Sequence, residues 1–220
     1  GESPVHDVVV VGAGPIGLAA ALELARHGIH SVILDDKSTV NDGSRAVCLA
    51  RHSLENLQQL GLAEAFLENA LGWTQGRSYY RSEQVYTLSM PHSDDERYLP
   101  MYNLQQQYTE QLLIDAAARS PFIELRWSSA CTGVTQQTDR VSVEVETAVG
   151  TYAMQARYCL AADGARSAVR HALNLPLHGE AYEGRYAIAD IRLHSNFPTE
   201  RRAFFDPPAV PGGTLLVHKR

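Results

Sequence analysis

A glycine-rich turn between an apolar strand and a helix is the feature that most limits how this chain can fold. Asp7–Val11 contains four valines, which is typical of a β-strand that is buried on both faces. The sequence GAGPIG follows at 12–17, and Leu18–His27 is rich in Ala and Leu, as in a helix that ends at Gly28. Ser31–Leu34 is a second apolar run. This order predicts a strand–helix–strand (βαβ) unit.

Each glycine of the turn has its own role in a dinucleotide site. Gly12 makes the tight turn, Gly14 lets the backbone approach a pyrophosphate, and Gly17 lets the helix pack closely on the strand. Pro15 and Ile16 lie between these glycines, just before the predicted helix, whose free N–H groups and dipole favour an anion. We therefore predict that all five residues bind a dinucleotide cofactor. A glycine-rich turn without a ligand is the alternative.

An acidic residue stands where such a site places a partner for the ribose. Asp35 ends the second strand, 18 residues after Gly17, and a carboxylate there accepts hydrogen bonds from a ribose diol. Asp36 is the candidate if the strand ends one residue later, and a merely solvated carboxylate is the alternative. From the start of the second strand to Asp36 the sequence contains no basic residue, and the first one is Lys37. The site therefore favours an adenosine with a free diol over NADP.

Composition excludes several classes of function. The chain has 220 residues, with 19 Lys and Arg against 25 Asp and Glu, so its formal net charge is −6. With no run of basic residues, neither a nucleic-acid surface nor a polybasic membrane patch is expected. The apolar run Val8–Leu24 is broken by glycines, a proline and Glu23 and lacks a basic flank, so we predict neither a signal peptide nor a membrane span.

Cysteine and histidine patterns carry no metal or disulfide signal. Cys48, Cys131 and Cys159 are odd in number and far apart, which favours a reducing, cytoplasmic location. The nine histidines form no HExxH pair and have no cysteine cluster beside them, so no metal site is expected.

The rest of the chain predicts further helices and a β-meander. Leucine spacing predicts a helix over Arg51–Leu60, and apolar positions predict another over Gln107–Arg119 and a short one over Ser167–Leu173. Gly72–Asn103, rich in tyrosine and serine, is interpreted as an insertion with short strands. An antiparallel meander is expected from four segments: Phe122–Trp127, Ala130–Thr138, Val141–Thr147 and Thr151–Tyr158. From Pro176 the composition shifts, and the chain ends near an apparently unfinished strand, Thr214–Val217.

Four segments in this order resemble the FAD-dependent aromatic hydroxylases, the single-component (class A) flavoprotein monooxygenases. They are the GAGPIG turn, Ser44-Arg45-Ala46 before the leucine-rich helix, Gln106 with Glu110 and Leu113, and CLAADGARSAVR at 159–170. The ending, from YEGR at 182–185 to FDPP at 205–208, is similar to the branch that acts on 3-(3-hydroxyphenyl)propionate and related phenols.

The resemblance implies roles for residues outside the glycine turn. Arg45 would contact the ribityl–pyrophosphate region, where its guanidinium offsets phosphate charge. Gln106 would form a hydrogen bond near the flavin. Asp163 and Gly164 would lie near the flavin dinucleotide and the path of the nicotinamide. A helix N-cap is the alternative for Asp163, although Ser167 is also placed for that role.

The resemblance also implies a fold and an activity. The fold would be α/β: a Rossmann-like FAD-binding domain with a β-meander at 1–75 and 104–175, plus part of a β-rich substrate domain at 76–103 and 176–220. The activity would be hydroxylation of a small phenolic substrate with O₂ and NAD(P)H as transient electron donor, through a flavin C4a-hydroperoxide. Because the flavin does the chemistry, no catalytic side chain is nominated.

The chain departs from the family pattern at two points. These hydroxylases usually carry Glu at the position of Asp35. Their second flavin segment, a Gly-Asp strand and a glycine-rich helix start, normally follows well after residue 220. The expectation is therefore a fragment of a longer enzyme that is inactive by itself.

Three other interpretations are compatible with the same glycine-rich turn. An NAD-dependent dehydrogenase would share the βαβ unit but would leave the Asp163-Gly164 segment without a role. A two-dinucleotide flavin reductase needs a second glycine fingerprint, which this sequence lacks. A truncated FAD-binding fragment without turnover is the non-enzymatic alternative.

Overall fold

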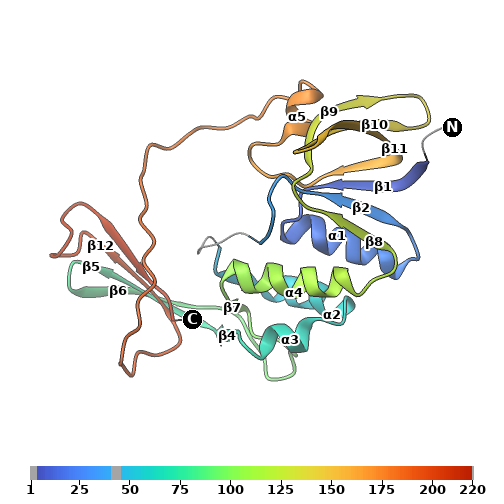
Figure 1. The fold of residues 1–220 in the computed structure, drawn as a ribbon. Helices are drawn as coiled ribbons and strands as arrows, with labels where there is room; N and C mark the ends of the chain where they lie inside the picture. Colours follow the sequence, from blue (N-terminus) through green and yellow to red (C-terminus); the bar gives the residue numbers. More distant parts are fainter. Residues whose placement is uncertain (1–3, 41–45, 220) are drawn as a thin grey trace. The chain divides into compact units, whose positions relative to one another are not determined.

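The computed structural model describes residues 4–40 and 46–219, and its chain divides into two compact units (Figure 1). The first unit comprises Gly1–Asp42 and Thr109–Ala187, and the second comprises Gly43–Tyr108 and Ile188–Arg220. Residues 43–75 and 104–108 thus group with 76–103, whereas the expected domains divide the chain at 75, 103 and 175. The assignment of a FAD-binding and a substrate domain remains a proposal.

The first unit contains a six-stranded mixed sheet in the order β8-β2-β1-β11-β10-β9. Strands β8, β2, β1 and β11 run parallel, and β11, β10 and β9 form an antiparallel meander. The strand bounds are β1 Val5–Val11, β2 Ser31–Leu34, β8 Ile123–Arg126, β9 Ala130–Gln136, β10 Val141–Thr147 and β11 Gly150–Ala161.

Helix α1 (Pro15–Arg26) covers one face of the parallel strands. Its buried positions, such as Leu18 and Leu22, recur at helical spacing and pack toward β1 and β2. Helix α4 (Gln106–Ala118) begins in the second unit and continues in the first, and α5 (Ala168–Ala172) packs beside β9. None of the described helices is long and apolar enough to cross a bilayer.

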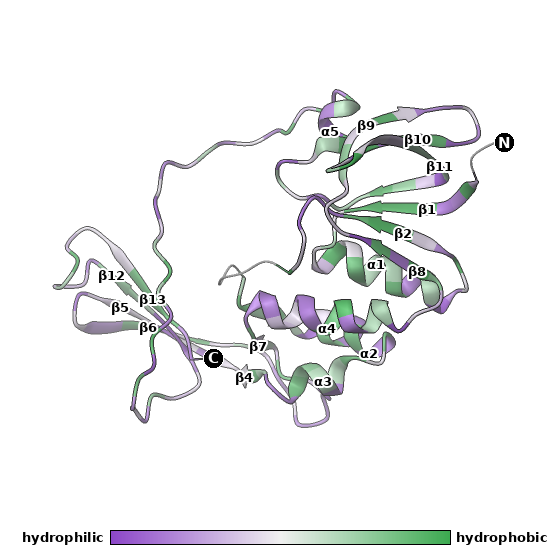
Figure 2. Ribbon diagram, in the orientation of Figure 1, coloured by the Kyte–Doolittle hydropathy of each residue, from purple (hydrophilic) through white to green (hydrophobic). Residues whose placement is uncertain are grey.

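The core of the first unit lies between the parallel strands and the meander. Its buried members come from the parallel strands β1 and β2, from the meander strands β10 and β11, and from α5; they are Val9, Val11, Val32, Leu34, Val143, Val145, Met154, Ala156 and Val169. In Figure 2 the inner parallel strands are almost continuously green, as expected for strands that are buried on both faces. Valine-rich strands therefore hold the glycine turn on a rigid base.

One strand belongs to both halves of this sheet. The first part of β11 pairs with β10 through Ala156, and residues from Gln155 to Ala161 pair with β1. Among the described residues, no strand pairs with the other edge of residues 157–161. The Ala162 N–H donates to the Val11 carbonyl oxygen at 2.7 Å, so by strand alternation the N–H and C=O groups of Cys159 and Ala161 face this open edge.

The second unit contains two small sheets. The three-stranded sheet has the order β3-β7-β4 and the four-stranded sheet the order β13-β12-β5-β6. The bounds of these strands, and of the two helices of this unit, are β3 Cys48–Ala50, α2 Arg51–Gln59, α3 Ala63–Leu67, β4 Leu71–Trp73, β5 Gln75–Tyr80, β6 Glu83–Ser89, β7 Met101–Asn103, β12 Arg201–Phe205 and β13 Thr214–Val217.

A buried ion pair network stabilises the four-stranded sheet. The Glu200 carboxylate, 5% exposed, accepts hydrogen bonds from Arg77 Nε at 2.9 Å and Arg202 Nε at 2.6 Å. Burial by itself raises the pKa of Glu200, but the hydrogen bonds and charges of the two arginines outweigh it and hold the pKa below its usual value. Glu200 therefore stays ionised and links β5 to β12.

The structure confirms most of the expected elements and corrects the pairing direction of one strand. The helices expected at 51–60, 107–119 and 167–173 are present within one residue at each end, whereas the helix expected at 18–27 begins three residues earlier, at Pro15. The segment Phe122–Trp127 was expected in the antiparallel meander, but its strand β8 pairs in parallel with β2. A strand of only four residues, Ile-Glu-Leu-Arg, looks the same in either pairing, because the course of the chain decides the direction of its neighbour.

The core assignment predicts that replacing a buried and an exposed leucine by alanine has very different effects on the free energy of unfolding. Replacing Leu34 by Ala should lower the free energy of unfolding by about 2–5 kcal/mol, because Leu34 is fully buried and leaves a cavity. The control Leu177→Ala, at a side chain that is 71% exposed, should change it by less than about 0.5 kcal/mol. Urea unfolding of both variants measures this, and equal effects would contradict the proposed core.

Candidate dinucleotide site

The glycine turn is shaped by contact with the chain that follows β11. Gly12 has φ +106°, and its N–H donates to the Leu34 carbonyl oxygen at 2.8 Å. A Cβ at Gly12 would overlap the carbonyl oxygen of Ala162 and approach the Cα of Asp163. Glycine is therefore required here by backbone conformation and by close approach.

The other two glycines differ in their surroundings. A Cβ at Gly17 would overlap the carbonyl oxygen of Gly12, so Gly17 permits the close packing of α1 on the turn. A Cβ at Gly14 would meet nothing within 4 Å. The space over Gly14 is open, which fits the approach of a ligand to the backbone there.

The start of α1 can receive an anion. Gly14 is the N-cap residue, Pro15 follows at the first helical position, and no side chain caps this end. The N–H groups of Ile16 and Gly17 lie in the first turn, where no intrahelical acceptor exists. No acidic residue stands in that turn. The end of this 12-residue helix therefore fits a pyrophosphate by its free donors and its dipole.

Asp35 is engaged with the turn itself. Its Oδ2 accepts the Ala13 N–H at 2.7 Å, its Oδ1 accepts the Lys37 N–H at 2.9 Å, and the residue is 7% exposed. A carboxylate has about four acceptor positions, so two remain for ribose hydroxyls. Asp36 is exposed. The structure thus gives Asp35 a second role that the sequence did not indicate, which is to fix the glycine turn.

Asp163 and Gly164 lie beside the same turn. The Asp163 carboxylate accepts the Ser167 hydroxyl at 2.6 Å and the Val169 N–H at 3.2 Å, and Ser167 accepts the Arg170 N–H at 3.0 Å. The Asp163 carboxylate and the Ser167 hydroxyl therefore both cap the N-terminus of α5. The φ of Gly164 is +76°, a conformation that glycine adopts without strain.

The remaining cofactor candidates belong to the second unit. The Gln106 N–H donates to the Ala46 carbonyl oxygen at 3.1 Å, and the Gln106 Oε1 accepts the Ala46 N–H at 3.3 Å. The Leu104 N–H donates to the Val47 carbonyl oxygen at 2.9 Å. These bonds join the start of α4 to the segment before β3. Arg45, the other candidate, lies outside the described residues.

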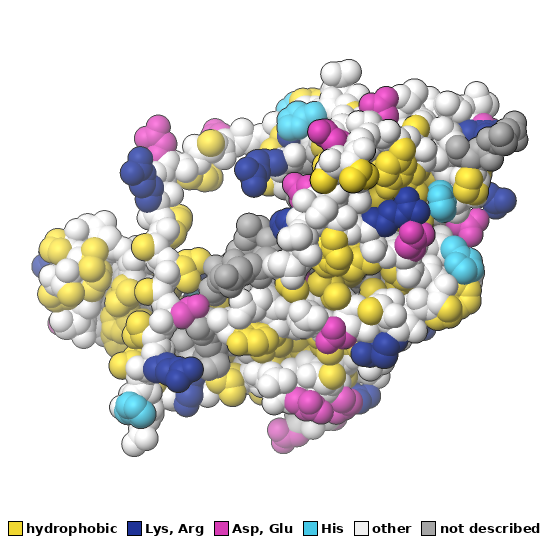
Figure 3. Space-filling view, viewed as in Figure 1, with side chains coloured by type: hydrophobic (Ala, Val, Ile, Leu, Met, Phe, Trp, Pro, Cys, Tyr) yellow, Lys and Arg dark blue, Asp and Glu magenta, His cyan; other side chains and the backbone are white. Residues whose placement is uncertain are grey.

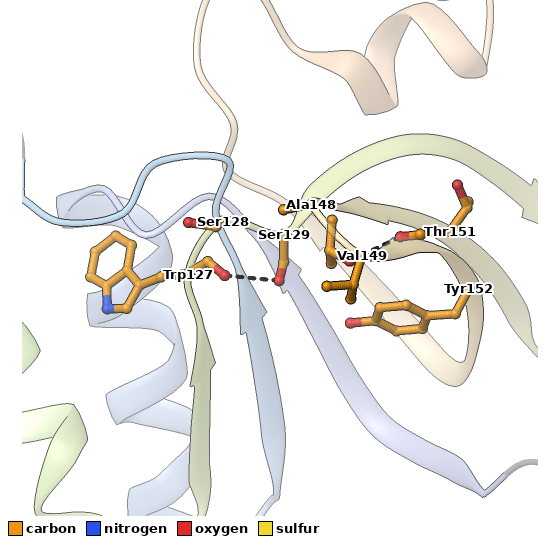
Figure 4. A pocket seen from close by; sticks show the side chains of 9 residues that line it. Trp127, Ser128, Ser129, Ala148, Val149, Thr151 and Tyr152 are labelled. Atoms are coloured by element: carbon orange, nitrogen blue, oxygen red, sulfur yellow. Dashed lines mark hydrogen bonds between the residues drawn. The ribbon is translucent and has the colours of Figure 1, made fainter.

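A hollow of about 510 Å³ lies near the Asp35–Lys37 segment (Figure 4). The loop after β8 and the turn between β10 and β11 line it, through Trp127, Ser128, Ser129 and residues 147–152. The Ser129 N–H donates to the Asp35 carbonyl oxygen at 2.8 Å, which ties this loop to β2. Small side chains and backbone dominate the hollow, and nothing in it indicates chemistry.

Neither a thiol nor a metal centre offers an alternative site. Burial raises the pKa of all three cysteines, of Cys159 to about 11, so none is a thiolate at neutral pH. The three cysteines are free. Within the part of the chain that the structure describes, no group of three His, Cys, Asp or Glu side chains could hold a metal ion. On the face shown in Figure 3, basic and acidic side chains are interspersed.

Comparison with known proteins agrees with this geometry. The family model described as "FAD binding domain" matches residues 5–206. The 3-(3-hydroxy-phenyl)propionate/3-hydroxycinnamic acid hydroxylase of Mycolicibacterium smegmatis is 30% identical over 186 residues, which cover 84% of this chain and 33% of that protein. The para-nitrophenol 4-monooxygenase of a Pseudomonas species is 29% identical, with 84% and 46% covered.

Solved structures give the same result. The p-nitrophenol 4-monooxygenase of Pseudomonas putida superposes with a TM-score of 0.75 at 28% identity, covering 82% of this chain and 46% of that one. The anhydrotetracycline hydroxylase of Streptomyces rimosus has a TM-score of 0.70 at 30% identity, with 81% and 35% covered. The chain thus spans between a third and a half of the length of these relatives. It belongs to the FAD-binding domain family of the flavin-dependent aromatic hydroxylases, and FAD is the cofactor of that family.

Proposed function

We propose that this chain is the FAD-binding part of a monooxygenase that hydroxylates a phenolic ring with O₂ and NAD(P)H. The observation that carries the proposal is the uncapped start of α1 next to the open space at Gly14, in a chain of this family. That arrangement suits a dinucleotide pyrophosphate. The relatives named above supply the reaction class, because their names describe hydroxylases and monooxygenases of phenols.

The residues of the first unit fit the adenosine and pyrophosphate half of FAD. The N–H groups at the start of α1 would hold the pyrophosphate, and Asp35, with Asp36 as the alternative, would accept the ribose hydroxyls. Arg45, Gln106, Asp163 and Gly164 are proposed contacts for the rest of the cofactor. When bound, FAD supplies electron transfer and oxygen activation, and the protein supplies orientation and exclusion of water.

The substrate and location are part of the same proposal. The relatives are named for hydroxyphenylpropionate, hydroxycinnamic acid and nitrophenol, all of which are phenols with a second polar substituent. We propose a small phenol of this kind as the substrate. The three free, protonated thiols support a reducing cytoplasm as the location.

An FAD-binding module without turnover is the second candidate. It is favoured by the fact that the chain covers only 33% and 46% of the two hydroxylases. The two candidates differ in one measurement, which is the amount of hydroxylated product formed for each NAD(P)H consumed. We expect residues 1–220 to consume NAD(P)H with little product, because hydroxylation needs a closed, dry site.

Exchanging two glycines separates cofactor binding from folding. Gly14→Ala should leave the thermal unfolding of the FAD-free protein unchanged, since its Cβ meets no atom, but should weaken FAD binding at least about tenfold by filling the pyrophosphate space. Gly17→Ala is the matched control and should lower stability by about 1–3 kcal/mol, because its Cβ overlaps Gly12. Calorimetry and FAD titration measure both effects. Normal FAD affinity in Gly14→Ala would refute the site.

A second pair of variants identifies the ribose acceptor. Asp35→Asn leaves one of two backbone N–H groups without a carboxylate oxygen, so it should cost about 1–3 kcal/mol of stability and also weaken FAD binding. Asp36→Asn, at an exposed neighbour, should change neither quantity. If FAD affinity falls only in Asp36→Asn, the ribose contact belongs to Asp36 instead.

Flavin absorbance and NAD(P)H oxidation test the reaction class. The purified protein, measured in the presence of saturating FAD, should show the two-band absorbance of bound oxidised flavin. A phenol that fits should speed NAD(P)H oxidation, since aromatic hydroxylases delay flavin reduction until the substrate is bound. An oxidation rate that is equal with and without every 3-hydroxyphenyl acid tested would contradict the hydroxylase assignment.

A further inference from the structure

A buried amide joins two side chains and a backbone carbonyl of the second unit that the dinucleotide site does not use. Asn103, 2% exposed, ends strand β7. Its Oδ1 accepts the Trp73 Nε1–H at 2.8 Å and the Cys48 thiol at 3.2 Å, and its Nδ2 donates to the Lys219 carbonyl oxygen at 2.7 Å. All of its side-chain polar atoms are therefore engaged, and the chain after β13 is fixed against β3 and β7.

His218 is held by this arrangement. Its Nδ1 lies 4.0 Å from the Cys48 Sγ, and its ring meets the Trp73 ring edge-on with centroids 6.5 Å apart. Burial, and then the positive charge of Arg201, lower the pKa of His218 below its ordinary value of 6.5. The imidazole is therefore neutral at neutral pH. Among the described residues no hydrogen bond reaches its Nε2, which can act as an acceptor.

Arg201 lies next to His218 on the same face of the four-stranded sheet. The register pairs Arg202 with Val217, so the next positions, Arg201 and His218, are cross-strand neighbours with side chains on one face. The charge of Arg201 acts on both Cys48 and His218. Within the described chain Arg201 forms no ion pair, and the adjacent Lys219 donates its Nζ–H to the Phe197 carbonyl oxygen at 3.1 Å. Arg201 thus remains a cation without a carboxylate partner there.

The group adjoins the predicted flavin contacts of the second unit. Cys48 follows directly on Ala46 and Val47, which Gln106 and Leu104 bind through the backbone bonds described above. A ring bound at His218 would therefore lie close to the segment from which we expect contacts to the flavin.

We propose that His218 and Arg201 bind the substrate, and that the substrate is a phenol with a second, anionic substituent. This inference rests on the proposed function. The phenolic O–H donates to His218 Nε2, while the Arg201 guanidinium pairs with the anionic substituent, a carboxylate. If the phenol ionises, its proton passes to Nε2 and the resulting imidazolium offsets the phenolate, so charge and protons balance without a further reactant. The Trp73 ring contacts the imidazole edge-on.

Three ligands and two variants test the pairing. The ligands are 3-(3-hydroxyphenyl)propionate, 3-phenylpropionate, which lacks the hydroxyl, and 3-propylphenol, which lacks the carboxylate. Binding to the FAD-saturated protein is measured by calorimetry. We expect His218→Leu to weaken both phenols about three- to tenfold and 3-phenylpropionate little. Arg201→Gln should weaken both carboxylates about tenfold and 3-propylphenol little.

Matched controls and a pH series complete the test. The exposed His52 and Arg97 provide His52→Leu and Arg97→Gln, which should change no affinity. In the unchanged protein the phenol affinity should fall as the pH drops through the pKa of His218, because protonation removes the acceptor, and His218→Gln should remove this dependence. The groups that face His218 are Cys48, whose pKa is raised by burial, and Arg201, so neither titrates in this range.

The outcomes separate this inference from the proposed function. If FAD does not bind, the proposed function fails whatever the phenols do. If FAD binds but His218→Leu weakens all three ligands equally, or no ligand binds the unchanged protein, the assignment of His218 and Arg201 is wrong.

Discussion

The first unit depends on the close approach between the GAGPIG turn and the chain that follows β11. The two backbones touch at Gly12 and Ala162, and the bond from Ala162 to Val11 keeps them in register. The strands β1 and β11 pair in parallel, and no side chain fits between the two segments that follow them. Asp163 is then carried to the side of the turn, and the continuation of β11 into the meander brings Val143 and Val145 over the valines of β1. One contact therefore fixes the cofactor turn, the start of α5 and the core together.

Polar side chains inside each unit fix backbone segments that are distant in sequence. In the first unit Asp35 holds Ala13 of the turn, 22 residues away, through a carboxylate that still has free acceptor positions. In the second unit Asn103 joins β3, β4 and the chain after β13 through one amide. Such groups can support a ligand site because a buried polar side chain is stable only in the geometry that satisfies it. The same residues therefore serve folding and positioning.

The sequence predicted the elements whose patterns are local. The valine run, the glycine turn and the leucine spacing identified β1, α1 and α2, since each depends on residues within one or two turns of chain. It could not predict β3, β4 and β12, because strands of three to five residues show no clear period. The strand Gly150–Ala161 was expected to end at Tyr158, and it continues to Ala161 because its last residues pair with β1 instead of β10. The bond from Asp35 to Ala13 depends on a tertiary contact and has no sequence signal, whereas the capping of α5 by Asp163 is local and was the alternative that the sequence offered.

The open edge of β11 has a consequence for the behaviour of the protein in solution. Residues 157–161 present main-chain donors and acceptors along one side, flanked by Tyr158 at 71% and Leu160 at 36% exposure. A row of this kind is a template on which another strand can add. A net charge of −6 opposes association only at long range and is screened by salt, whereas strand addition acts at contact. Strand addition at this edge would therefore involve five residues of one strand and would depend little on overall charge.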